Sequence, residues 1–174
     1  MKKIFVFVFA ALLAVGLANA QTPEELEKST KIKPRMTVPA FKVDMLDGGV
    51  WNIEELRGKV VLINFWATWC PPCQQELARV QTDLIDRFKG RDFVFLPISR
   101  GEKTERVKAF MDKKGYTFPT GLDTDQKIFG MFAETYIPRT FLINSDGTVY
   151  SYAVGYEPEE FDALLVEIEK LLSK

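Results

Sequence analysis

Histidine is absent from this chain of 174 residues, and cysteine occurs only twice, at Cys70 and Cys73. Without histidine, the chain has no His-based metal site, no histidine general base and no Ser-His triad. Two cysteines supply only two of the four ligands that a structural zinc site requires, so such a site is excluded as well. A c-type haem needs a histidine directly after the second cysteine, and that position holds Gln74. The chemistry that remains is that of the cysteine pair.

An excess of positive charge is also missing. Lysine and arginine number 23 against 24 aspartates and glutamates, which gives a formal net charge of −1. No part of the sequence forms a strongly basic run. Because nucleic-acid binding relies on clustered basic residues, we expect no nucleic acid among the partners.

Only one run is long and apolar enough to concern a membrane, and it covers residues 4–20. Lys2 and Lys3 precede it, and it ends at Ala20 in a small-x-small pattern. These features predict a secretory signal peptide over residues 1–20, cleaved after Ala20, and an exported, periplasmic location. An uncleaved membrane anchor is the alternative, for which the run is marginal against about 30 Å of hydrocarbon. The rest of the chain suits one domain.

The remaining sequence alternates between strand and helix patterns. Residues 59–66 form a near-continuous apolar run, which is typical of a strand buried on both faces. After Cys73, apolar residues recur at spacings of three and four and predict a helix that ends at Gly90. We expect a polar extension over residues 21–37 and an α/β domain over residues 38–174, with a central mixed sheet flanked by helices. The other predicted elements are strands at 41–45, 50–52, 93–98, 140–143 and 149–154, and helices at 24–28, 102–114, 126–132 and from Pro158 onward.

The two cysteines lie where the buried strand gives way to the helix, in the order Cys70-Pro71-Pro72-Cys73. Residues three apart on a helix are about 5–6 Å from one another, which suits a disulfide. A helix N-terminus favours a thiolate, and proline fits the first helical position. A purely structural role is less favoured, because closing so short a loop contributes only ~2 kcal/mol, against ~3 kcal/mol for fifteen residues. We therefore predict a redox-active disulfide that needs no cofactor.

Residues 65–73 resemble the active-site segment of thioredoxin-like proteins, and Glu76 narrows the resemblance to the TlpA/ResA-like thiol-disulfide oxidoreductases. The similarity extends over about residues 38–172. It implies a thioredoxin-like fold with an N-terminal hairpin, an insertion between the CxxC helix and Pro138, and a cis bond at that proline. Further segments that match the family are Gly58-Lys59-Val60-Val61, Phe118-Pro119, Ile137-Pro138 and Asp146-Gly147.

The resemblance also implies a mechanism and its partners. Cys70 would form a mixed disulfide with a client protein, and the more buried Cys73 would resolve it. Clients would carry disulfides or thiols, cytochrome c precursors being one client type of the family, and a membrane-embedded donor would supply electrons. The residues expected to contact the client are Trp69, Pro71, Pro72, Ile137 and Arg139, with Pro138 against the cysteine pair and Trp66 in the core.

Three positions depart from the thioredoxin pattern. Asn64 stands where thioredoxins carry a buried acid, and an amide cannot titrate. Ala78 replaces a kinking proline, so we expect a straighter helix. Arg139 follows Pro138 where thioredoxins commonly carry threonine; it would favour the Cys70 thiolate or contact a partner, unless it is merely solvated.

Glu76 is the candidate for the role that Asn64 cannot fill. It lies one helical turn beyond Cys73, beside inward-facing residues of the apolar stripe. Partial burial would raise its carboxyl pKa, so that it could hold or pass a proton. The alternative is an ordinary surface glutamate, solvated or paired with Arg79.

Reduction of client disulfides is the leading functional hypothesis, and oxidation or isomerisation is the runner-up. CxxC proteins span roughly −270 to −120 mV, about 7 kcal/mol, and the Pro-Pro pair does not place this chain on that scale. A thiol peroxidase is a distant alternative, because Ile63 and Ala67 occupy the positions at which peroxiredoxins carry proline and threonine. A copper chaperone is another, but histidine is absent and the methionines are scattered.

Overall fold

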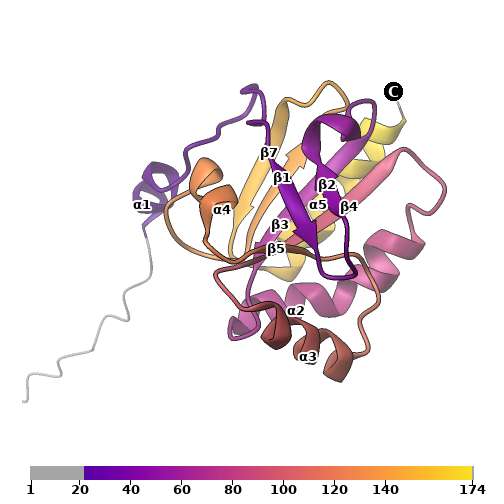
Figure 1. Ribbon diagram of the computed structural model, residues 1–174. Coiled ribbons are helices and arrows are strands. Elements are labelled where there is room, and N and C mark those ends of the chain that lie inside the picture. Colours follow the sequence, from indigo (N-terminus) through magenta and orange to yellow (C-terminus); the bar gives the residue numbers. More distant parts are fainter. Residues whose placement is uncertain (1–21, 174) are drawn as a thin grey trace, which may run out of the picture.

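The computed structural model describes residues 22–173, so the predicted leader and its cleavage site lie outside the described residues. Within this range the strands form one sheet in the order β2-β1-β5-β4-β3-β6-β7 (Figure 1). The pairs β3–β4 and β4–β5 are parallel and the others are antiparallel, which confirms the predicted mixed sheet and the N-terminal hairpin. The strands are β1 (Lys42–Met45), β2 (Val50–Asn52), β3 (Val60–Trp66), β4 (Phe93–Arg100), β5 (Gly121–Asp123), β6 (Arg139–Ile143) and β7 (Val149–Val154).

The helices occupy the predicted places, with one difference after the cysteines. Regular α-helix ends at Val80, and a π-helical segment over Gln81–Asp86 continues it. Leu84 and Phe88 are nevertheless buried, so the predicted apolar stripe is confirmed, although the helix continues in π-helical rather than α-helical form. The helices are α1 (Pro23–Lys28), α2 (Pro71–Val80), α3 (Thr104–Lys114), α4 (Lys127–Phe132) and α5 (Pro158–Leu172), with a 3-10 turn, η1, at Ile53–Leu56.

Every residue of β3 is buried, as its apolar run predicts. Alternate residues of the strand face two separate apolar clusters. Val61, Ile63 and Phe65 join a cluster that includes residues of α4, whereas Leu62 and Trp66 join one that includes residues of α2, α3 and α5. In Figure 1, α1 and α4 accordingly lie together on one side of the sheet, away from α2 and α3. Helices on both faces bury this central strand from both sides.

Among the strands, β5 is the one that sequence patterns missed. It has only three residues, between β1 and β4, and it belongs to the segment between α2 and β6 in which the resemblance places an insertion. Gly121 begins it because side chains of the neighbouring strands cover this position: a Cβ here would lie 2.7 Å from Cγ2 of Val43 and 3.3 Å from Cγ1 of Ile98. A larger residue would have to displace the Val43 side chain, so the glycine marks close packing rather than a turn.

The N-terminal extension is a packed part of the fold. Its helix α1 confirms the short helix predicted at residues 24–28. Beyond the helix, bridges pair Thr30 with Ala133 and Thr37 with Thr148, and Ile32 is buried. No helix among residues 22–173 is long and apolar enough to cross a membrane.

Candidate active site

The cysteine pair lies at the N-terminus of α2, directly after the loop that leaves β3. Cys70 is the N-cap residue of the helix and Pro71 is at its first position. The two cysteines form a disulfide with Cα atoms 5.3 Å apart, and the backbone N–H of Cys73 donates to Sγ of Cys70 at 3.3 Å. A helix N-terminus directed at this sulfur favours negative charge on it. The predicted disulfide and its place in the fold are confirmed.

The surroundings of the disulfide differ in exposure. Cys70 is 3% exposed and Cys73 is 0% exposed, so the little accessible surface that the pair retains belongs to Cys70. Trp69 is 55% exposed beside it, and Pro71 is exposed as well. Trp66 is fully buried, as expected of a core residue. A client protein would therefore meet the indole of Trp69 and the ring of Pro71 before it reaches Cys70.

The loop before β6 brings the predicted proline to the disulfide. The bond between Ile137 and Pro138 is cis, which confirms the prediction, and Pro138 is buried. The carbonyl oxygen of Ile137 lies 3.7 Å from Sγ of Cys70. This carbonyl can accept a hydrogen bond from the Cys70 thiol once the disulfide is reduced. Because β6 pairs directly with β3, the loop is held next to the start of α2.

Glu76 is buried below the disulfide in a polar cluster with Asn64 and Thr140. The antiparallel register of β3 and β6 places Asn64 opposite Thr140, and α2 supplies Glu76 from above. The Asn64 amide donates to one carboxyl oxygen at 3.0 Å, and the Thr140 hydroxyl donates to the other at 3.1 Å. The same amide also lies 2.8 Å from Oγ1 of Thr140. Asn64, which stands where thioredoxins carry a buried acid, is thus in direct contact with Glu76, the candidate for that role.

Burial dominates the electrostatics of this cluster. Glu76 is 5% exposed, and burial raises its carboxyl pKa from 4.5 to about 7, although the hydrogen bonds from Asn64 and Thr140 oppose the shift. The alternative of a surface glutamate paired with Arg79 is wrong, because Arg79 instead contacts Asp83 at 2.7 Å and Asp162 at 2.6 Å.

A small cavity reaches Glu76 from the side of α5. Its volume is about 20 Å³, and its lining includes Thr140, Tyr156 and Glu160. A space of this size has room for about one water molecule, and most of its lining surface is apolar. Neither cysteine lines it, so Glu76 borders a space that is separate from the client-facing surface of the disulfide.

Arg139 requires a correction. The residue is 0% exposed, so its side chain is accessible neither to a client nor to solvent. In the sheet register Arg139 lies opposite Phe65, on the face that packs against α4 rather than α2. Its hydrogen bonds reach the N-terminal extension and the loop before Pro138.

Two features of the site escaped sequence reasoning. Thr140 was predicted only as a strand residue, and only the register shows that it binds Glu76. Glu102, expected simply as a helix residue, is buried and accepts hydrogen bonds from the backbone N–H and the hydroxyl of Thr68, both at 2.6 Å. Arg106 pairs with this carboxylate at 3.0 Å. These contacts fix the loop that ends at Cys70. The one sequence signal for the role of Glu102 was its position as an acidic residue directly after a strand and Gly101.

No group of three or more His, Cys, Asp or Glu side chains in residues 22–173 is arranged to hold a metal ion.

The comparisons with known sequences agree with this geometry. Residues 34–152 match the AhpC/TSA family. The thiol-disulfide oxidoreductase ResA of Bacillus anthracis is 34% identical over 122 residues, which cover 70% of each chain. The ResA protein of Geobacillus thermodenitrificans is 29% identical over 153 residues, which cover 88% of this chain and 87% of the relative.

Solved structures show the same relationship. A candidate protein disulfide isomerase of Bacteroides thetaiotaomicron superposes with a TM-score of 0.80 at 32% identity, over 84% of this chain and 94% of that one. A thiol:disulfide interchange protein of the thioredoxin family from Chlorobium tepidum gives a TM-score of 0.67 at 28% identity, over 80% and 97% of the two chains. With a disulfide at the helix N-terminus and a cis-proline beside it, this chain belongs to the AhpC/TSA family and, within the thioredoxin superfamily, is a thiol-disulfide oxidoreductase of the ResA type.

Proposed function

We propose that this enzyme reduces disulfides of client proteins outside the cytoplasm, with Cys70 as the attacking thiol and Cys73 as the resolving thiol. The observation that carries the proposal is the position of the disulfide. Only Cys70 keeps accessible surface, and it lies beside the exposed Trp69 and the carbonyl of Ile137. An extended client segment would place its own disulfide against Cys70 while its backbone pairs with the loop at Ile137 and its side chains meet Pro71 and Pro72.

The exchange proceeds in two displacements. The Cys70 thiolate attacks one client sulfur, forms a mixed disulfide and releases the other client sulfur as a thiolate, which takes up a proton. The Cys73 thiolate then attacks Sγ of Cys70, which restores the Cys70–Cys73 disulfide and releases the second client sulfur. Two electrons pass from the enzyme dithiol to the client disulfide.

Glu76 serves the second displacement as a proton acceptor. Cys73 is buried, so its thiol needs a base nearby before it can attack, and Glu76 lies one helical turn away. A carboxyl whose pKa is about 7 exchanges protons readily near neutral pH. The small cavity toward α5 borders this carboxyl on a side that a bound client would not cover, since neither cysteine lines it.

Continued turnover needs a donor that returns the disulfide to the dithiol. The leader predicted at residues 1–20 would deliver the protein across the membrane, so the donor would be a membrane-embedded dithiol protein with its redox centre on the same side. This donor would meet the same surface at Cys70, since Cys73 is inaccessible.

The test is to trap clients. Cys73→Ser leaves the attacking thiol and removes the resolving one, so mixed disulfides with clients should accumulate and should dissolve on treatment with a small thiol. The matched control is Cys70→Ser, which should trap nothing. Trapping by Cys70→Ser but not by Cys73→Ser would reverse the two roles, and trapping by neither would overturn the proposal.

Isomerisation or oxidation is the second candidate, and the 32% identity with the candidate isomerase of Bacteroides thetaiotaomicron favours retaining it. The reduction potential decides between them. A reductase is expected near the thioredoxin value of about −270 mV, whereas an isomerase or oxidant is expected at about −180 mV or above. Equilibration of the Cys70–Cys73 pair with glutathione buffers measures it.

A further inference from the structure

Arg139 carries a set of contacts that the exchange steps do not use. All its hydrogen-bond partners are neutral oxygen atoms: the hydroxyls of Thr30 at 2.5 Å and Ser29 at 2.9 Å, and the carbonyls of Thr135 at 2.9 Å and Tyr136 at 3.4 Å. No carboxylate pairs with it among residues 22–173. Burial of a cation without a counter-charge costs free energy of folding, so the hydrogen bonds to these four oxygen atoms must offset that cost.

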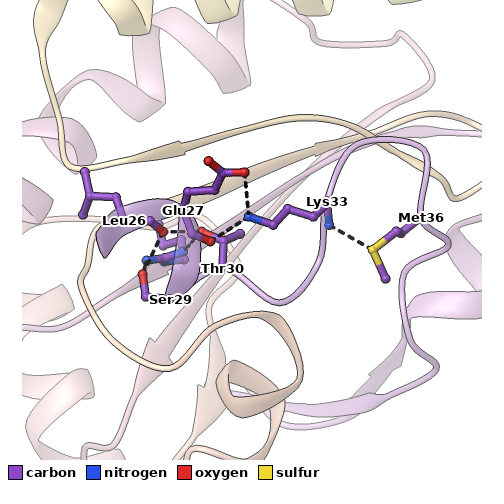
Figure 2. Close-up of polar contacts among 7 residues, drawn as sticks. Leu26, Glu27, Ser29, Thr30, Lys33 and Met36 are labelled. Carbon is purple, nitrogen blue, oxygen red and sulfur yellow. Dashed lines mark hydrogen bonds and ion pairs between the residues drawn. The ribbon is translucent and has the colours of Figure 1, made fainter. Parts of the chain in front are cut away.

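The extension presents its two hydroxyls as acceptors. Figure 2 shows Ser29 and Thr30 at the end of α1, and each hydroxyl donates to the carbonyl oxygen of Leu26 at 2.8 Å. A hydroxyl has one proton to donate, so the lone pairs of both oxygens remain for the guanidinium of Arg139. The C-terminal turn of α1 thus forms a receptor arranged in advance for an arginine.

The same guanidinium also holds the loop before the cis-proline: Nη2, which binds Ser29, donates to the Thr135 carbonyl as well, and Nε donates to the Tyr136 carbonyl. Its two carbonyl partners, Thr135 and Tyr136, directly precede Ile137, whose own carbonyl faces Sγ of Cys70. Tyr136 has a positive φ of 65°, a conformation that a bulky residue adopts only where its surroundings hold it. A further backbone bond, from the N–H of Glu134 to the carbonyl of Ser29 at 2.9 Å, attaches the same loop to the same turn.

We propose that Arg139 is a positioning residue for thiol exchange: it connects the N-terminal extension to residues 135–137 and thereby sets where the Ile137 carbonyl lies relative to Cys70. It acts through geometry rather than through its field at the sulfur, because its side chain lies on the face of the sheet away from α2. The extension is therefore part of the client-binding apparatus. This inference rests on the proposal that clients pair with the backbone at Ile137.

The test compares a protein substrate with a small one. Reduced Arg139→Met is assayed in single turnover with insulin, whose chains must dock along the loop, and with glutathione disulfide, which needs little docking. At a temperature where the variant is fully folded, we expect about tenfold slower reduction of insulin and little change with glutathione disulfide, because displaced docking groups cost rate. Equal rates with insulin in the variant and the parent would overturn the inference.

Further variants separate positioning from folding and from charge. Ser29→Ala/Thr30→Val removes the receptor while keeping Arg139, and it should reproduce the insulin defect; adding Arg139→Met to it should cause no further loss. Arg139→Lys keeps the charge but cannot span four oxygens, so it should remain defective; full recovery would show that charge is what matters and would contradict the inference.

The matched control is Lys31→Met, which removes from the same segment a contact of 2.9 Å to the Gly130 carbonyl and an exposed ion pair of 3.9 Å with Glu134, without touching Arg139. Lys31→Met should leave the rate of insulin reduction unchanged. A defect equal to that of Arg139→Met would show that general loosening of the extension explains the slower rate, and it would contradict a specific role of Arg139. If the parent protein itself fails to reduce insulin but reduces glutathione disulfide, the proposed function fails and not the positioning role alone.

Discussion

The two faces of strands β3 and β6 hold opposite kinds of buried chemistry only one residue apart. On the α2 face, Asn64 and Thr140 hold the carboxyl of Glu76. On the α4 face lie the adjacent residues of the two strands, Phe65 after Asn64 and Arg139 before Thr140. The first face carries a group whose charge changes near neutral pH, and the second carries a permanent cation beside a cluster of aromatic rings.

The difference shows how one sheet separates proton chemistry from support. A titratable group is useful at the disulfide only if its pKa lies near the working pH, and desolvation under α2 brings it there. The opposite face needs rigidity instead, which Phe65 supplies with ring centroids 5.3 Å from Phe129 and 5.2 Å from Phe132. If this division holds, changes on the two faces should differ in their dependence on pH.

Phe65→Ala should have the largest effect on stability. It removes a fully buried ring from the aromatic cluster, and such truncations cost about 3–5 kcal/mol. The loss should depend on pH far less than a change at Glu76 does, because the removed ring does not titrate and Arg139 beside it keeps a pKa of about 10, well above pH 8. Urea unfolding of the oxidised protein at both pH values measures it, and a loss that varies strongly with pH would break the comparison.

Glu76→Gln should change stability in the opposite sense, and only above about pH 5. The folded-state pKa of Glu76 is raised to about 7, so the folded protein binds this proton more tightly than the unfolded chain. The parent therefore loses stability as pH rises from 4.5 toward 7, by about 3 kcal/mol in total, and the amide does not. At pH 8 the variant should be more stable than the parent by roughly that amount, and at pH 4 the two should be similar.

The oxidised protein is used for this comparison, so that no thiol titrates. Glu159→Gln on the exposed surface of α5 is the control for loss of one charge. A pH dependence that is the same in parent, Glu76→Gln and Glu159→Gln would show that Glu76 does not titrate as its burial requires.

Thr140→Val should have a smaller effect. It keeps the shape of the side chain but removes the hydrogen bond to Glu76, which costs about 1–3 kcal/mol. That bond favours the charged carboxylate, so its loss should raise the pKa of Glu76 further and make the cost larger at pH 8 than at pH 5. Carboxyl carbon chemical shifts followed by NMR report the shift directly, and an unchanged titration would remove Thr140 from the cluster.

Much of this architecture could be predicted from the sequence. The apolar run before Cys70 and the helical stripe after it place the disulfide correctly, because burial patterns repeat with the period of each element. The burial of Glu76 followed from its place beside that stripe. Its full depth did not, because that depends on strand β6 lying opposite β3.

What the sequence could not show depends on contacts between distant segments. Thr140 meets Asn64 only through the antiparallel register, and Thr30 meets Arg139 across more than a hundred residues. Arg139 was expected to act near Cys70 or on a partner because it directly follows Pro138, the proline predicted to lie against the cysteine pair. Alternation along β6 turns the Arg139 side chain to the other face of the sheet, where it meets the N-terminal extension. The polar composition of that extension suggested no role in the core.

The most direct test of the account is the pH dependence of resolution of the mixed disulfide. A mixed disulfide between Cys70 and a chromogenic thiol is prepared by rapid mixing, and release of that thiol by Cys73 is followed from pH 5 to pH 9 in the parent and in Glu76→Gln. The account predicts that release by the parent rises with an apparent pKa near 7, and that the amide variant loses this inflection and is slower by about 10²-fold at pH 8. Identical rates and profiles in the two proteins would contradict the assignment of Glu76 as the proton acceptor.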